Sequence, residues 1–235
     1  MLKAFTSNSK TILSVDFNRN TTCPQICNYC YVENMERIYP AYSAKINNNY
    51  EWALNTPDNF AAQLNTEYWK LRQSKAKAWK RLNTLPVRIY GSGDYIPIHY
   101  EFLSKLTFKF FIISKSLTLK TMLVHINKLM DLPNLTSIVL SFDKQNIKNY
   151  NNVKNFYKND RFKFAYTGMP EEFEEIKKLY NFDIFFNIGR KKVDLLKSTN
   201  FKEQCPCDSG ILAHNESCSF CNKCWRSSVT RRSQI

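Results

Sequence analysis

Cysteine is the residue whose number and spacing in this sequence point most directly to chemistry. Three of the eight cysteines lie within residues 23–30, five lie within residues 205–224, and none lies between these groups. The N-terminus lacks the continuous apolar segment of a signal peptide, and no stretch approaches the ~20 apolar residues that a membrane-spanning helix needs. We therefore expect a soluble cytoplasmic protein without membrane contacts, whose cysteines are metal ligands or catalytic groups rather than disulfides.

The first group consists of Cys23, Cys27 and Cys30, with the spacing C-x3-C-x2-C, directly after an apolar run at residues 12–17. Three thiolates this close together can converge on one metal centre, whereas closed structural sites use four ligands. Three protein ligands leave one coordination position open, and catalytic metal centres need such a position. The alternative is a structural zinc site, which needs a fourth ligand from elsewhere, and His99 is a candidate.

Six short runs rich in Ile, Val, Phe and Tyr predict buried β-strands. From the second run onward they begin 22 to 27 residues apart, which leaves room for one helix and two loops each time. This alternation predicts a parallel sheet with crossover helices. The six runs are residues 12–17, 87–90, 109–114, 136–142, 162–166 and 184–188.

The intervening segments predict helices at residues 56–83, 118–130 and 190–198, and a further helix that begins at Pro170. Two Asn-rich stretches, residues 47–49 and 146–155, are interpreted as solvated loops or weak helix ends. Six βα units are too few for the eight of a complete barrel. We therefore expect an α/β fold, as an open partial barrel or a doubly wound sheet, with the active face at the carboxyl ends of the strands.

The sequence contains only five glycines, and their positions exclude both the dinucleotide-binding fingerprint and the P-loop. Four of them follow predicted strands: Gly91, Gly93, Gly168 and Gly189. At a strand end, a glycine either forms a turn or lets a ligand approach the backbone closely.

With Cys23, Cys27, Tyr29 and Cys30 in the loop after the first strand, the sequence resembles the radical S-adenosylmethionine (radical SAM) enzymes. Their signature is C-x3-C-x2-C with an aromatic residue before the last cysteine, in a partial (β/α)6 barrel, which residues 1–200 would form here. The resemblance implies that the three cysteines hold a [4Fe-4S] cluster whose fourth iron binds S-adenosyl-L-methionine through its amino and carboxylate groups. It also implies reductive cleavage to a 5′-deoxyadenosyl radical, with electrons from an external donor such as flavodoxin or ferredoxin.

The resemblance extends to residues after the later strands. The family places a Gly-Gly-Glu-like segment against the methionyl amino group, and this chain has Gly91-Ser92-Gly93-Asp94, with one residue inserted and Asp in place of Glu. Ser141 and Asp143 correspond to polar groups for the ribose, although both also suit a helix N-cap. Asn187 corresponds to a position near the adenine. Lys115 is a candidate for a carboxylate, but a solvated lysine is the favoured interpretation, and no residue is identified as catalytic.

The second cysteine group has the spacing C-x-C-x10-C-x2-C-x2-C and consists of Cys205, Cys207, Cys218, Cys221 and Cys224. Two close pairs of thiolates suffice for a four-cysteine site, and His214 adds a sixth possible ligand. A zinc-ribbon-like site and a second [4Fe-4S] cluster are both open. We expect residues 201–235 to form a small metal-binding appendage, and its CxxCxxCW segment resembles the ends of small phage-encoded radical proteins.

Thirty-four Lys and Arg residues against 20 Asp and Glu residues give a formal net charge of +14, which favours an acidic partner. Basic and aromatic side chains concentrate on the predicted helix at residues 56–83, a combination that suits nucleic acid. The alternative is a solvated helix face with its Trp side chains in the core. The residues concerned are Tyr68, Trp69, Lys70, Arg72, Lys75, Lys77, Trp79, Lys80 and Arg81.

Taken together, the sequence favours a radical SAM enzyme that modifies a base in nucleic acid. One alternative is a radical SAM enzyme that modifies a peptide. Another is a non-catalytic, zinc-stabilised nucleic-acid-binding protein. The enzyme hypotheses predict a brown, oxygen-sensitive protein that cleaves S-adenosylmethionine, whereas the binding protein would be colourless and indifferent to it.

Overall fold

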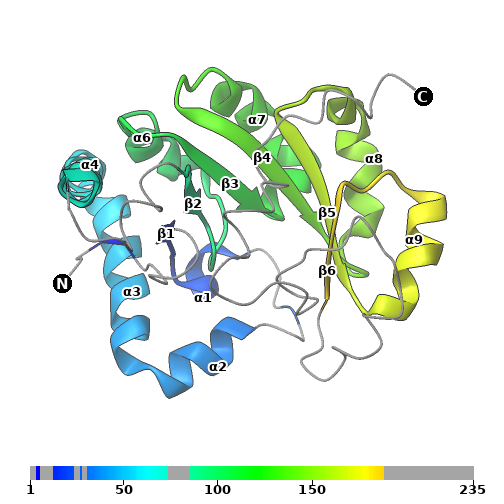
Figure 1. Ribbon diagram of the computed structural model, residues 1–235, viewed down its shortest axis with the longest axis horizontal. Helices are drawn as coiled ribbons and strands as arrows, with labels where there is room; N and C mark the ends of the chain where they lie inside the picture. The colour runs from blue at the N-terminus through cyan, green and yellow to red at the C-terminus, as the bar shows by residue number, and fades with distance from the viewer. Residues whose placement is uncertain (1–3, 6–12, 24–26, 28–30, 74–84, 188–235) are drawn as a thin grey trace.

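The computed structural model describes residues 4–5, 13–23, 27, 31–73 and 85–187 of the chain. These residues form an α/β fold around a sheet of six parallel strands (Figure 1). The strands are β1 (Ser14–Val15), β2 (Val87–Ile89), β3 (Phe110–Ser114), β4 (Leu135–Phe142), β5 (Phe162–Gly168) and β6 (Ile184–Asn187).

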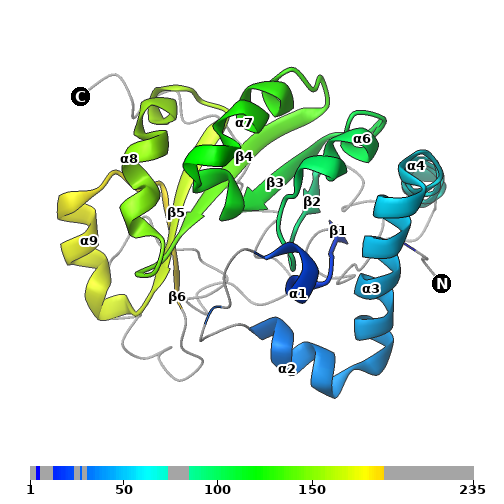
Figure 2. The ribbon, with the colours of Figure 1, turned by 180° about the vertical axis from the view of Figure 1, so that it is seen from behind.

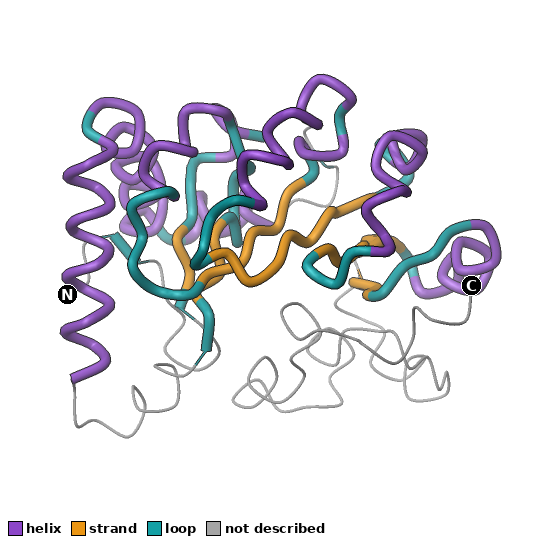
Figure 3. The backbone as a smooth tube through the Cα atoms, turned by 90° about the horizontal axis from the view of Figure 1, so that it is seen from above, coloured by secondary structure: helices purple, strands orange, loops and turns teal. Residues whose placement is uncertain are grey.

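The strands lie side by side in the order in which they follow one another in the chain. Every neighbouring pair is parallel. A doubly wound sheet reverses its strand order at a switch point, and this order has no reversal, so that alternative expectation is wrong. Right-handed crossovers that always advance in one direction place their helices on the same face of a sheet. Figure 3 shows most of the helical segments on one side of the strands.

Helices α3 and α4 lie at the end of the sheet that carries β1, and α8 and α9 lie at the end with β5 and β6 (Figure 2). The α-helices are α1 (Arg19–Thr22), α2 (Tyr31–Ile38), α3 (Pro40–Asn55), α4 (Pro57–Gln73), α6 (Tyr100–Leu103), α7 (Leu123–Met130), α8 (Tyr150–Val153) and α9 (Phe173–Leu179). Short 3-10 helices occupy Pro97–His99, Ser116–Thr118, Lys120–Met122, Ile147–Asn149, Lys154–Lys158 and Pro170–Glu172. In the part of the chain that the structure describes, no helix has both the length and the apolar character needed to cross a bilayer.

Both faces of the sheet carry buried apolar side chains. Along β4, Ile138, Leu140 and Phe142 belong to the main core, which includes side chains from the helices. Val139 lies between them and belongs to a second cluster with Phe111, Ala165 and Ile184. Successive side chains of a strand point to opposite faces, so the two clusters occupy opposite faces of the sheet. Burial on both faces is typical of parallel sheets and explains why their sequences form continuous apolar runs.

The predicted strands are all present, with ends that differ by three residues or fewer wherever the chain is described. The helix predicted at residues 56–83 begins at Pro57 as α4, and residues 74–84 lie outside the described residues. The segment predicted as a single helix at residues 118–130 is divided instead. Leu119 takes an extended backbone conformation between two 3-10 turns, and α7 begins only at Leu123. The helix predicted at residues 190–198 also lies outside the described residues.

The interpretation of residues 47–49 as a solvated loop or weak helix end is wrong. They lie within the 16-residue helix α3, and Asn49 is buried. Its side-chain amide donates to the main-chain oxygens of Ala4, at 2.9 Å, and Asp16, at 3.0 Å. Asn146 is also buried. A buried amide that satisfies main-chain groups stabilises the fold, but its sequence resembles that of a surface loop, which explains the wrong interpretation.

His99, the candidate fourth zinc ligand, lies in the aromatic core. Its ring is fully buried, centred 4.6 Å from the ring of Phe17, and its Nδ1 is 2.9 Å from the hydroxyl of Tyr90. Burial lowers the pKa of His99 to about 3. Among the described residues, no group of three or more His, Cys, Asp or Glu side chains is arranged to hold a metal. Within this part of the chain, the position of His99 fits a packing role.

We predict that His99 makes folding stability fall on acidification. With a pKa of about 3 in the folded chain and roughly 6.5 in the unfolded chain, the unfolded state binds the extra proton between these values. The free energy of unfolding should therefore rise with pH from about 3 to about 6.5, by up to about 1.4 kcal/mol per pH unit. Urea unfolding of wild type and His99→Asn across this range measures the slope. The variant should lose that contribution, whereas His125→Asn should keep it. Identical slopes in wild type and His99→Asn would contradict the prediction.

Candidate active site at the carboxyl edge of the sheet

Four chain segments meet where β1, β2, β3 and β4 end. Because the strands are parallel, their carboxyl ends lie at one edge of the sheet, where α/β proteins build their ligand sites. The segments are residues 16–23 with Cys27 after β1, residues 90–95 after β2, residues 114–118 from the last residue of β3 onward, and residues 141–146 from the last two residues of β4 onward. Side chains from all four make polar contacts with one another.

The segment after β1 leads into the first cysteine group through the short helix α1. Asn18 caps this helix, because its side-chain oxygen accepts the main-chain N–H of Asn20 at 2.7 Å. Thr22 closes it by donating to the main-chain oxygen of Asn18 at 2.7 Å. Cys23 follows at the C-cap and is half-buried. The local sequence thus turns the chain sharply at the carboxyl edge and starts the cysteine loop there.

The Gly91–Asp94 turn after β2 packs tightly against the end of β1. Ser92 receives a hydrogen bond at its main-chain oxygen from the N–H of Phe17, and its own N–H donates to Asp16 Oδ1 at 3.0 Å. Gly93 has a φ of 75°. A Cβ atom there would lie 2.7 Å from Thr22 Oγ1 and 2.8 Å from the oxygen of Phe17. Only glycine fits this approach and this backbone conformation without strain.

Asp94 connects the ends of β2 and β3. Asp94 is 3% exposed, and its carboxylate accepts five hydrogen bonds. The donors are the hydroxyls of Ser114 and Ser116 and the main-chain N–H groups of Tyr95, Lys115 and Ser116, at 2.6 to 3.1 Å. Burial raises the pKa of Asp94, and the hydrogen bonds oppose that rise without cancelling it. These contacts fix the turn that begins where β3 ends.

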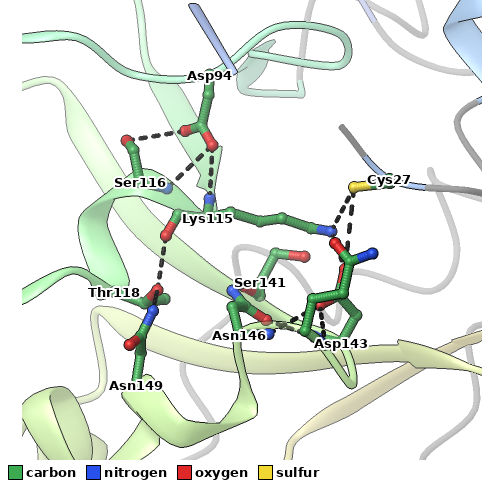
Figure 4. A network of polar contacts seen from close by, with 10 residues as sticks. Cys27, Asp94, Lys115, Ser116, Thr118, Ser141, Asp143, Asn146 and Asn149 are labelled. Carbon is green, nitrogen blue, oxygen red and sulfur yellow. Dashed lines mark hydrogen bonds and ion pairs between the residues drawn. The ribbon is translucent and has the colours of Figure 1, made fainter. Parts of the chain in front are cut away.

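Lys115 is not the solvated lysine that the sequence favoured. Its side chain is only 16% exposed and extends from the end of β3 toward Cys27 and Asp143 (Figure 4). Its Nζ donates to Cys27 Sγ at 2.9 Å and forms an ion pair with Asp143. Burial lowers the pKa of Lys115, but the hydrogen bonds to Asp143 and Cys27 outweigh it and raise the pKa overall. The ammonium is therefore held in its charged form between a carboxylate and a sulfur.

Asp143 forms the turn cap that the sequence offered as one alternative, and its two carboxylate oxygens face different sides. Its Oδ1 accepts the main-chain N–H groups of Gln145 and Asn146, at 2.9 and 3.1 Å, which is a turn cap. Its Oδ2 pairs with Lys115 and lies 3.9 Å from the sulfur of Cys27. Asn146 completes the turn by donating to the main-chain oxygen of Ser141 at 3.0 Å.

The structure thus brings together Cys27, Asp94, Lys115 and Asp143, with Ser141 on the adjoining end of β4 (Figure 4). Asn187 ends β6 opposite Gly168, two strands from β4. Several predicted residues lie outside the described residues: Tyr29, Cys30, Cys205, Cys207, His214, Cys218, Cys221 and Cys224. Sequence reasoning missed Ser114, Ser116 and Asn146. The pair Ser-x-Ser directly after the apolar run of β3 was the available signal for the first two.

Cys27 lies at the carboxyl ends of the strands, whereas the described part of the basic, aromatic helix contacts the chain near the amino end of β3. Trp69 is 39% exposed, and its indole N–H donates to Thr107 Oγ1 at 2.9 Å, just before β3 begins. The guanidinium of Arg72 lies over the Trp69 ring, 5.0 Å from its centre. Trp69 therefore lies on the surface rather than in the core. Tyr68 is buried in the main core, and Lys70 is exposed. Lys75, Lys77, Trp79, Lys80 and Arg81 lie outside the described residues.

We predict that Gly93→Ala destabilises the carboxyl edge. The substitution forces an L side chain into a left-handed conformation, which costs on the order of 1–3 kcal/mol, and brings its Cβ against the oxygen of Phe17. Gly91→Ala is the comparison in the same turn: the side chains of Arg88 and Asp16 would have to shift to admit a Cβ there, but Gly91 does not have the left-handed backbone of Gly93. Urea unfolding should show the larger loss for Gly93→Ala. A larger loss for Gly91→Ala would contradict the assignment.

A family model for gene product 88 matches residues 2–227, and the chain therefore belongs to the gene product 88 family. Comparison with the curated proteins and with the solved structures found no match for the chain.

Proposed function

We propose that this member of the gene product 88 family is a radical SAM enzyme that reductively cleaves S-adenosylmethionine to a 5′-deoxyadenosyl radical. The observation that carries the proposal is the position of Cys27. The middle cysteine of the C-x3-C-x2-C sequence lies at the carboxyl edge of a parallel α/β sheet, beside the Lys115–Asp143 ion pair. A reactive centre in an α/β protein is expected at this edge.

The fold that we propose is a partial (β/α)6 barrel. The uninterrupted order of six parallel strands supports it, and so does the gathering of most helices on one side of the strands (Figure 3). In a barrel of this kind, the carboxyl ends of the strands and the loops that follow them form the site. Residues 1–200 would make up this unit, and residues 201–235 would form the small metal-binding appendage.

The chemistry of the residues at the edge fits an iron–sulfur cluster. Cysteine sulfur is the ligand that such clusters use, and both Cys23 and Cys27 are half-buried rather than enclosed in the apolar core. Cys23, Cys27 and Cys30 would hold the cluster. When bound, a [4Fe-4S] cluster supplies the electron for cleavage of S-adenosylmethionine, and an external flavodoxin or ferredoxin would supply it to the cluster.

Lys115 is the residue that we assign to the carboxylate of S-adenosylmethionine. Its ammonium lies at the edge beside Cys27, and its raised pKa keeps it charged. A partly buried ammonium binds a carboxylate through a charge-assisted hydrogen bond, which is stronger than a neutral one. Asp143 would hold Lys115 in place, because its other oxygen is fixed by the Gln145–Asn146 main chain.

For the C-terminal cysteines, we propose a separate metal centre, either a second [4Fe-4S] cluster or zinc. The five cysteines of this group supply more thiolates than one closed four-ligand site requires. They are Cys205, Cys207, Cys218, Cys221 and Cys224. Iron, sulfide and zinc analysis of the purified protein distinguishes the two metals.

The substrate that we propose is a base in nucleic acid. The net charge of +14 supports an anionic partner. Because the described part of the basic helix lies at the edge opposite Cys27, Trp69 and Arg72 would contact the substrate chain away from the reacting base. A nucleic acid is long enough to reach both edges, since one strand extends several ångströms per nucleotide.

We predict that Cys27→Ala abolishes S-adenosylmethionine cleavage. Wild type that is purified anaerobically, loaded with iron and sulfide and then reduced in the presence of S-adenosylmethionine should form 5′-deoxyadenosine, which is measured by chromatography. Cys27→Ala should form none, because two thiolates no longer hold the cluster. Thr21→Ala, an exposed change in the same segment, should retain the wild-type yield. A zinc-loaded, iron-free wild type that forms no deoxyadenosine even after reconstitution would overturn the proposed function.

We also predict salt-sensitive binding of single-stranded nucleic acid. Each phosphate that the protein neutralises should contribute about −0.7 to the slope of log affinity against log salt concentration. Fluorescence anisotropy with a labelled RNA or DNA oligonucleotide measures this slope. Polyglutamate of equal charge is the matched control, since it lacks bases that could stack on Trp69. Equal affinity for both polymers, or none for either, would contradict a nucleic-acid substrate, and the second result would favour a peptide.

A further inference from the structure

The Asp94 carboxylate holds the backbone that carries Lys115. The N–H of Lys115 donates to Asp94 Oδ2 at 3.0 Å, and the N–H of Ser116 donates to the same oxygen at 3.0 Å. The hydroxyl of Ser114 donates to Oδ1 at 2.6 Å. The three consecutive residues that begin at the end of β3 are thus all bound to one carboxylate, which fixes the direction in which Lys115 leaves the strand.

The main chain and the side chain of Lys115 bind different partners. Its main chain is bound to Asp94 on one side of the turn, while its side chain extends the other way to Cys27 and Asp143 (Figure 4). A lysine side chain has four rotatable bonds and loses substantial entropy when it is ordered. A fixed backbone does not lower that loss, but it fixes the point from which the side chain extends, and Asp94 holds that point in place.

Asp94 has little capacity left for a ligand. An ionised carboxylate offers about four lone-pair positions, and five donors already occupy them. The residue is also buried, with an exposed fraction of 3%. An amino group of a ligand would have to displace a main-chain N–H or a serine hydroxyl, and the displaced donor would remain buried without a partner, which costs about 1–3 kcal/mol.

We propose that Asp94 is a positioning residue, which acts on S-adenosylmethionine through Lys115 and does not itself touch the amino group. The inference rests on the proposed function and changes the role of one residue within it. The carboxylate after β2 aligns the turn after β3, and Lys115 on that turn binds the carboxylate of S-adenosylmethionine.

The test compares two ligands that differ in one group. Decarboxylated S-adenosylmethionine lacks the carboxylate that Lys115 would bind but keeps the amino group. Equilibrium dialysis against the reconstituted, unreduced protein measures both dissociation constants without turnover. Asp94→Asn should weaken S-adenosylmethionine binding by about tenfold, the order expected for a lost contact to a charged group, and should leave the affinity for the decarboxylated ligand unchanged.

A double-mutant cycle separates positioning from direct contact. If Asp94 acts through Lys115, the Asp94→Asn, Lys115→Met double variant should bind S-adenosylmethionine no more weakly than Lys115→Met alone. Losses that multiply, or an equal loss of affinity for the decarboxylated ligand in Asp94→Asn, would overturn the inference and assign Asp94 to the amino group.

Two further variants guard against a merely structural effect. Asp183 lies just before β6, and its carboxylate accepts the main-chain N–H of Phe164 at 2.9 Å. Asp183→Asn removes this carboxylate and should leave both affinities unchanged. If Asp94→Asn fails to fold, Ser114→Ala removes one of its donors and should show a smaller loss with the same ligand dependence. A wild type that assembles its cluster but binds neither ligand overturns the proposed function, and this inference with it.

Discussion

A single buried carboxylate organises the carboxyl edge of the sheet. Asp94 must be satisfied by donors, because a charged group left unpaired away from water is costly. Those donors come from the turns after β2 and β3, and the main-chain N–H of Asp94 donates to Thr22 at the end of α1. Three connections of the fold therefore meet at this residue. The cysteine loop leaves α1 directly beside it, so the geometry of the site depends on Asp94 being satisfied.

The polar groups at the carboxyl edge lie next to an aromatic core, which the apolar runs of the sequence predict. Phe17 lies two residues after β1, and Phe142 ends β4. Both belong to the main core on the helix-facing side, and the residues next to them in sequence provide the polar groups. Asp16 contacts the β2 turn, and Asp143 contacts Lys115. Strand alternation thus turns one residue into the core and its neighbour toward the site. The apolar runs that predict the strands also predict where the polar contacts occur.

The sequence predicted the strands well, because apolar runs of this composition form buried strands with few alternatives. The class of chemistry proposed at Cys27 comes from the spacing of the first three cysteines and from the family that this spacing resembles. The sequence could not predict the contact between Lys115 and Cys27, because the two residues are 88 positions apart. They meet only because the segments after β1 and β3 lie at the same edge of the sheet. It also missed Asn49, since a buried amide that binds main-chain oxygens and a solvated one have the same local sequence.

The central claim is that the first cysteine group alone holds a cluster that binds S-adenosylmethionine. Electron paramagnetic resonance of a variant with Cys205, Cys207, Cys218, Cys221 and Cys224 changed to Ala tests it most directly. After anaerobic reconstitution and reduction, the account predicts the signal of one reduced [4Fe-4S] cluster, and a change in that signal when S-adenosylmethionine is added. An iron-free variant, or a cluster whose signal is unchanged by S-adenosylmethionine, would contradict the account.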